Sequence, residues 1–167
     1  MLEWYKRLRH SRGFGIHSPS AYRMICEILR PSKLYGYYAY ADLERFANME
    51  NTHSELCLIY RIMVDLHPGT VISIGSKSVT ETIKKALPAC YVSERIQNSC
   101  DLAVVGLKGV DLSVNCEWQS IFLYNEGIGL ADVFISKMTA GHVFLSHKHC
   151  LILNRADLPF QIFSLNY

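Results

Sequence analysis

An α/β fold with a small, mostly parallel sheet is predicted by three features of this 167-residue chain. The first is an apolar run over 70–75 that ends at Gly75 and is followed by a polar turn and an amphipathic helix. The second is a helical pattern over 52–66, just before this strand. The third is a series of short apolar segments after it, which are typical of further strands. Alternating helix and strand patterns favour a parallel sheet covered by helices.

The length suits a single domain with a substantial core. We expect an N-terminal helical extension over 1–50 and an α/β domain over 51–167, which together form one compact unit. Hydrophobic residues make up 50% of the chain and charged residues 19%, which excludes a disordered protein. A net charge of +2 is too small to indicate a nucleic-acid or membrane partner by itself.

A cytoplasmic location is expected from what the chain lacks. No apolar run approaches the ~20 residues that span a bilayer. The first residues do not form the apolar stretch of a signal peptide. The six cysteines are scattered and form no Cys-x-x-Cys pair, so we expect buried free thiols.

Caps and prolines indicate the N-terminal helices. A first helix is expected over 2–9. Ser18 caps a second helix, with Pro19 at its first position and Pro31 at its end. The tyrosine-rich segment 34–40 has no clear period. We interpret it as a loop or short helix that covers the sheet, with a substrate-pocket lining as the alternative.

Two capping-box patterns are expected to open the helices on either side of the central strand. Thr52 and Glu55 form the first, and Ser78 and Glu81 form the second. Pro88 ends the second helix.

Later apolar segments are expected to complete the sheet. They lie at 90–94, 102–106, 142–146, 150–153 and 160–165. The last two of these are expected to form a terminal antiparallel hairpin. Residues 115–124 are interpreted as a short helix, and 128–138 fits either a helix or a strand.

The connection from 90–94 to 102–106 is unusually short. A parallel crossover normally contains a helix and takes at least about ten residues. Residues 95–101 reach only about 23 Å when extended, enough to run back along a short strand and step past a neighbour. Either a strand–helix unit is absent or the two strands are antiparallel.

The pattern over about 52–167 resembles the class I S-adenosylmethionine-dependent methyltransferases, which have a Rossmann-like sheet. The segment Arg9-His-Ser-Arg-Gly-Phe-Gly-Ile-His-Ser-Pro19 also resembles a leader found in largely uncharacterised bacterial members. In that family the first strand ends in an acidic residue and a glycine-rich loop that hold the cofactor. An acidic residue after the second strand binds the ribose. The resemblance implies S-adenosylmethionine as cofactor and methyl transfer as activity.

The resemblance places five residues at the cofactor position. They are Ser73, Gly75, Ser76, Lys77 and Glu94. Ser73 replaces the acidic residue, Gly75 matches the first glycine and Lys77 falls at the second. Glu94 matches the ribose-binding residue, about twenty residues past the loop.

The departures from the family pattern predict a degenerate site. A non-glycine residue forced to positive φ costs about 1 kcal/mol. A lost hydrogen bond to a charged group costs roughly 1.5–3 kcal/mol. Lys77 also brings a positive charge near the sulfonium. Together these changes weaken binding by about 3–5 kcal/mol, from micromolar to millimolar.

Three functions are therefore considered. The first is a methyltransferase-like protein, active or inactive, for which the sequence identifies neither catalytic residues nor the substrate. Methyl transfer often needs only proximity of the reactants. The second is a non-catalytic association protein that keeps the fold. The absent unit would leave apolar sheet surface or an unpaired edge, which a second copy would cover to form a homodimer. The third is an anion or nucleotide site at 76–78.

No metal site is predicted, because the histidines near the C-terminus lack partner ligands. His142, His147 and His149 are therefore interpreted as core or surface residues.

Overall fold

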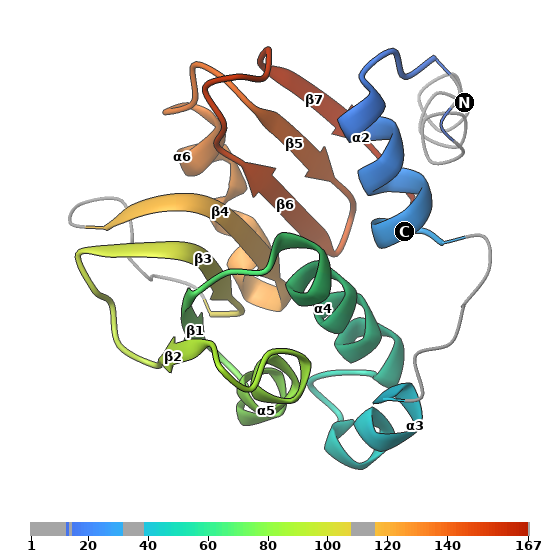
Figure 1. The fold of residues 1–167 in the computed structure, drawn as a ribbon, viewed down its shortest axis with the longest axis vertical. Helices are drawn as coiled ribbons and strands as arrows, with labels where there is room; N and C mark the ends of the chain where they lie inside the picture. The colour runs from blue at the N-terminus through green and yellow to red at the C-terminus, as the bar shows by residue number, and fades with distance from the viewer. Residues whose placement is uncertain (1–12, 14, 32–38, 108–115, 167) are drawn as a thin grey trace.

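The protein forms a seven-stranded sheet with helices on both faces (Figure 1). The structure, a computed structural model, describes residues 13, 15–31, 39–107 and 116–166. The strand order is β2-β1-β3-β4-β6-β5-β7. Four of the six neighbouring pairs are parallel, and the two pairs that include β6 are antiparallel. The predicted α/β class is confirmed, and the arrangement is compatible with a Rossmann-like fold.

The elements have the following bounds. The helical elements are α2 (Pro19–Arg23), η1 (Met24–Leu29), α3 (Ala39–Leu43), η2 (Glu44–Phe46), α4 (His53–Leu66), α5 (Lys77–Ala86), η3 (Asn125–Leu130) and α6 (Ala131–Ile135). The strands are β1 (Thr70–Ile74), β2 (Tyr91–Ser93), β3 (Ser99–Val105), β4 (Glu117–Tyr124), β5 (His142–Leu145), β6 (His149–Leu153) and β7 (Gln161–Ser164).

The N-terminal part packs onto the α/β part. Ser18 caps α2 as predicted, because its side chain accepts a hydrogen bond from the Ala21 N–H. The helix continues as the π-helical η1, and Ala21 and Ile25 are fully buried in the same core cluster as α4. The helix expected over 2–9 and the tyrosines at 32–38 lie outside the described residues.

Helix α4 forms as predicted. The Thr52 hydroxyl accepts a hydrogen bond from the Glu55 N–H, and His67 ends the helix in the left-handed conformation with φ 47°. The apolar stripe of α4 is buried against the sheet and η1. This helix therefore connects the N-terminal extension to the sheet.

The predicted cap of α5 is wrong by two residues. Ser76 is the N-cap and accepts a hydrogen bond from the Ser78 N–H, so the helix begins at Lys77. Lys77 thus has ordinary helical geometry, and the backbone strain expected there does not arise. Gly75 instead adopts the positive φ, at 148°.

The described part of the helix expected over 115–124, residues 116–124, is not helical. The stretch 117–124 forms β4, whose last five residues are buried, between β3 and β6. Central strands are buried on both faces, so they show no alternation that separates them from a buried helix. The ambiguous segment 128–138 is largely helical and contributes to η3 and α6.

The antiparallel hairpin lies one strand earlier than predicted, between β5 and β6. Strand β7 pairs with the other side of β5 and is parallel to it. The chain crosses the start of β5 at Gly141, whose N–H donates to the Leu158 carbonyl and whose carbonyl accepts from the Gln161 N–H. A side chain at Gly141 would overlap the Leu153 carbonyl, so the crossing requires glycine. With seven strands, the sheet is larger than expected.

The short crossover is confirmed as a parallel connection without a helix. Strands β2 and β3 lie on opposite sides of β1, and both are parallel to it, so the antiparallel alternative is wrong. The Asp101 carboxylate fixes this region: it accepts hydrogen bonds from the Gly69 N–H, the Thr70 N–H and the Thr70 hydroxyl, at 2.9, 2.9 and 3.0 Å.

Alternating side chains of the sheet fill two cores. Val71, Leu102, Val104 and Phe122 belong to the cluster of α4 and α5. Ile72, Ala103, Val105 and Ile121 belong to the cluster of α6. Ile72 is fully buried, so the short crossover does not leave the middle of β1 exposed. Within the described residues, no helix is long and apolar enough to cross a membrane.

Candidate functional site

The carboxyl ends of β1, β2, β3 and β4 meet at one edge of the sheet, because these four strands are parallel. Ligands of open α/β sheets bind at this edge, where the strand order reverses on either side of one strand. Here the reversal is at β1. A cavity of about 470 Å³ lies there, lined by Ser73, Ile74, Gly75, Lys77, Glu94 and Leu107. We call it the β1 cavity.

Four of the five predicted cofactor residues therefore line one cavity. Glu94 directly follows β2 and is exposed, so its carboxylate is open to a ligand. Lys77 is also exposed, and its ammonium lies 3.8 Å from the Glu81 carboxylate. The Lys77 ammonium can therefore contact a ligand from the solvent side of the cavity, although the Glu81 carboxylate partly balances its charge.

The two predicted serines are engaged within the protein. The Ser73 side chain is buried, and its hydroxyl lies 3.0 Å from that of Thr80. Ser76 caps α5 and does not line the β1 cavity. Of the predicted polar side chains, Glu94 and Lys77 remain to contact a ligand.

Tyr124 fills the edge between β1 and β3. Its hydroxyl accepts a hydrogen bond from the Ser76 N–H at 3.2 Å. A side chain at either Gly75 or Gly106 would overlap the Tyr124 phenol, so both glycines leave room for this ring. Burial raises the pKa of Tyr124, so the phenol stays neutral. The sequence interpretation missed Tyr124, which ends a strand that had been interpreted as a helix.

The N-terminus of α5 offers little to an anion. The Ser76 N–H is bonded to Tyr124, and the Ser78 N–H to the Ser76 hydroxyl. The N–H groups of the next two residues bond to the Ser76 carbonyl. The Ser78 hydroxyl accepts from Asn48 at 2.8 Å. The anion site proposed at 76–78 therefore has few free donors.

A second cavity, of about 840 Å³, lies beside the N-terminal half of α4. We call it the α4 cavity. The polar residues that matter here are Glu50, Glu55, Arg61, Asn125, Lys148 and His149, all of which line it. Among the described residues, it shares no lining residue with the β1 cavity.

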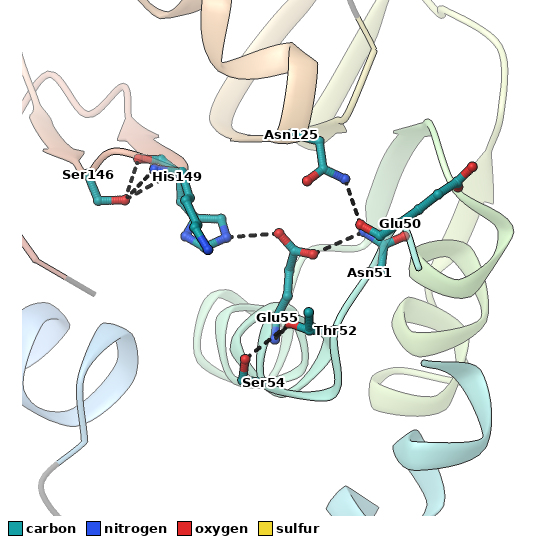
Figure 2. Close-up of polar contacts among 9 residues, drawn as sticks. Glu50, Asn51, Thr52, Ser54, Glu55, Asn125, Ser146 and His149 are labelled. Carbon is teal, nitrogen blue, oxygen red and sulfur yellow. Dashed lines mark hydrogen bonds and ion pairs between the residues drawn. The ribbon is translucent and has the colours of Figure 1, made fainter. Parts of the chain in front are cut away.

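A buried acid–base pair joins two elements at the α4 cavity. His149 Nε2 donates to Glu55 Oε1 at 3.0 Å, and the two side chains are only 9% and 11% exposed (Figure 2). Asn51 donates to the other carboxylate oxygen at 3.2 Å. Burial alone would raise the pKa of Glu55, but hydrogen bonds from His149, Asn51 and the Thr52 backbone together hold that pKa below its ordinary value of 4.5. Glu55 is therefore ionised at neutral pH.

Hydrogen bonds in two loops lie near this pair. Ser146 in the β5–β6 turn accepts from the His149 N–H at 3.0 Å and donates to the His149 carbonyl at 3.1 Å (Figure 2). Asn125 adopts the left-handed conformation with φ 49°, which asparagine tolerates better than most residues. Its amide donates to the Glu50 carbonyl at 3.1 Å.

The C-terminal histidines are separated in space. His142 is fully buried and packs edge-on against Phe144 and Phe163, whereas His147 and His149 line the α4 cavity. Within the described part of the chain, no three His, Cys, Asp or Glu side chains are placed to hold a metal ion. All six cysteines are free thiols.

Comparisons with known proteins identify no relative of this chain. No family model matches it, and neither the curated proteins nor the solved structures include a significant match. The resemblance to class I methyltransferases therefore rests on the residues themselves.

The Tyr124–Ser76 hydrogen bond predicts a clear stability effect. Tyr124→Phe leaves the Ser76 N–H without its acceptor, so we expect the free energy of unfolding in urea to fall by about 1–3 kcal/mol. The matched control is Tyr91→Phe, because Tyr91 is 59% exposed and its hydroxyl bonds, among the described residues, to Gln97 alone. That variant should change stability by less than about 0.5 kcal/mol. Equal effects in both variants would contradict the role given to Tyr124.

The Glu55–His149 pair predicts a pH-dependent stability difference. Because folding depresses the pKa of Glu55, its carboxylate stabilises the protein above about pH 4.5, and this contribution is lost as the pH falls through the depressed value. Glu55→Gln should therefore lower the free energy of unfolding by about 1.5–3 kcal/mol near pH 7.

This deficit should shrink in acid, as measured by urea unfolding at a series of pH values. Glu126→Gln, at an exposed position, is the control and should follow the wild type throughout. A Glu55→Gln curve parallel to that of the wild type at every pH would refute the assignment.

Proposed function

We propose that this protein is a methyltransferase-like ligand-binding protein whose β1 cavity takes S-adenosylmethionine or its demethylated product with reduced affinity. One observation carries the proposal. Ser73, Gly75, Lys77 and Glu94, chosen from the sequence alone, line a single cavity at the carboxyl edge of β1 and β2. The parallel pairing of β1 and β2 brings the ends of both strands to this edge.

Glu94 supports the nucleoside part of the proposal. Glu94 directly follows β2, and its carboxylate is exposed. Strand β2 pairs with β1, which Gly75 directly follows. A carboxylate at this place accepts hydrogen bonds from both hydroxyls of a ribose. Gly75 has no side chain, and its backbone borders the cavity, so a ligand can approach the end of β1 closely.

Ser73 and Ser76 explain why the affinity should be reduced. Ser73 has no negative charge, and its hydroxyl is held by Thr80, so it cannot replace a carboxylate that would bind the cationic methionine end. The Ser76 N–H is already bonded to Tyr124. Lys77 has ordinary helical geometry, so no binding free energy is lost to backbone strain there. The missing hydrogen bond to a charged group remains, and it costs about 1.5–3 kcal/mol, which makes the complex roughly ten- to a hundredfold weaker.

Self-association is a second candidate, favoured by the outer edge of β7. This strand is the last in the sheet order, and β5 is its sole strand partner among the described residues. Phe160 and Ile162 are 41% and 46% exposed there. An unpaired edge with exposed apolar side chains favours pairing with a second copy. In such a dimer the second copy would cover the β7 edge, and not the sheet surface expected next to the short β2–β3 crossover.

Isothermal titration with S-adenosylmethionine, and separately with S-adenosylhomocysteine, tests the first proposal. The wild type should bind both ligands, and Glu94→Gln should weaken each by roughly tenfold or more, because the ribose loses a charged acceptor. Glu117→Gln is the control, since Glu117 is exposed at the opposite end of the parallel strands. Absence of binding to the wild type, or equal losses in the two variants, would overturn the proposal.

Light scattering over a concentration series tests the second candidate. If β7 forms the contact, the wild type should be dimeric and Ile162→Lys monomeric, because a charge on the edge opposes strand pairing. Tyr91→Lys, on the edge strand at the other side of the sheet, should remain dimeric. A monomeric wild type would exclude self-association through this edge.

A further inference from the structure

Arg61 is a buried cation on the wall of the α4 cavity. It lies on α4 and is only 8% exposed. Its Nε–H donates to the Ile28 carbonyl at 2.7 Å, and Nη1 donates to the Tyr40 hydroxyl at 3.3 Å. A guanidinium has five N–H groups, so three have no partner among the described residues. None of the described carboxylates lies within ion-pair distance of Arg61, as the ion pairs of this region show.

A buried charge without a counter-charge is costly, and proteins normally pair it. The Ile28 carbonyl, at the end of η1, stabilises Arg61 in part, as a helix C-terminus does. That contact also explains how Arg61 holds η1 against α4. It uses one N–H only, so it leaves most of the hydrogen-bonding capacity of the guanidinium unexplained.

The surroundings of Arg61 are basic. Arg30, two residues after the Ile28 carbonyl that binds Arg61, also lines the α4 cavity and is exposed. Lys148 is exposed as well, and it lines the cavity next to His149. The two carboxylates of the cavity lie at the other end: Glu55 is in the first turn of α4 and is hydrogen-bonded to His149, and Glu50 precedes the helix. Since Arg61 follows Glu55 by six residues, the two positions are about 9 Å apart along the helix axis. The cavity therefore has a cationic end and an acidic end.

We propose that the α4 cavity binds a small organic anion, a carboxylate or a phosphate monoester, whose anionic group contacts the Arg61 guanidinium. The planar fork of arginine matches both kinds of oxyanion. The carboxylates of Glu50 and Glu55 repel the anionic group from the opposite end, so the ligand has one orientation. A hydroxyl or amine at the other end of the ligand would complement that acidic end. The volume of about 840 Å³ is in the range of small-molecule sites.

This site is independent of the proposed function. The α4 cavity shares no described lining residue with the β1 cavity, so each can fail without the other. It also differs from the anion site considered at 76–78, where the donors are already bonded within the protein.

Inorganic phosphate and acetate are the probes, because they carry the two candidate anionic groups without the rest of a ligand. Each is titrated into the wild type at constant ionic strength, with binding followed by calorimetry and by amide NMR shifts. We expect saturable binding of at least one probe, with the largest shifts on α4 and in the β5–β6 turn. The probe that binds more tightly identifies a phosphate or a carboxylate as the natural group.

Three variants locate the site. Arg61→Gln should weaken binding by roughly ten- to a hundredfold, and Arg61→Lys by less, because lysine keeps the charge but loses the fork. Lys148→Gln changes an exposed side chain and should weaken binding by about twofold. Arg45→Gln is the control, since Arg45 is an exposed arginine outside the cavity.

Circular dichroism shows whether each variant folds. If Arg61→Gln does not, because η1 loses its contact, Arg61→Lys and Lys148→Gln decide the test. Binding that is unchanged in Glu94→Gln and reduced in the Arg61 and Lys148 variants supports the proposal. Titrations of the wild type that do not saturate for either probe overturn it, as do losses that are equal in the Arg45 control.

Discussion

The phenol of Tyr124 determines the shape of the carboxyl edge of the sheet. It passes over the end of β3 and reaches the Ser76 N–H at the start of α5, and both Gly75 and Gly106 lack the side chains that would collide with it. The ring therefore occupies the place between β1 and β3 where open α/β sheets usually admit a ligand. What remains for a ligand at β1 is the side that faces Glu94 and Lys77.

Helix α4 carries the chemistry of the second cavity. Its apolar stripe packs against the sheet, and its polar positions Glu55 and Arg61 are also largely buried. Glu55 is matched by His149 from β6, so this pair holds the helix to the antiparallel half of the sheet. Arg61 has no such acidic match among the described residues, and this asymmetry distinguishes a structural pair from a binding group.

The short crossover between β2 and β3 runs close to the β1 cavity. Because no helix separates β2 from β3, the chain returns past β1 at once, and Asp101 fixes the start of β1 through three hydrogen bonds. Glu94 lies at the beginning of this return. Its position at the β1 cavity is set by the parallel pairing of β2 with β1.

Local sequence signals determined the class of fold, the central strand that ends at Gly75, and helix α4 with its Thr52 cap, because caps, glycines and periodicity act over a few residues. The four predicted residues that line the β1 cavity came from the family resemblance. Tertiary structure alone decided that 117–124 is a central strand, that β5 separates β6 from β7, and that Tyr124, His149 and Arg61 meet their partners. The contacts between elements join residues 21 to 94 positions apart, from Tyr40–Arg61 to Glu55–His149. No pattern within a short window specifies such pairs; the packing of the sheet against α4 brings them together.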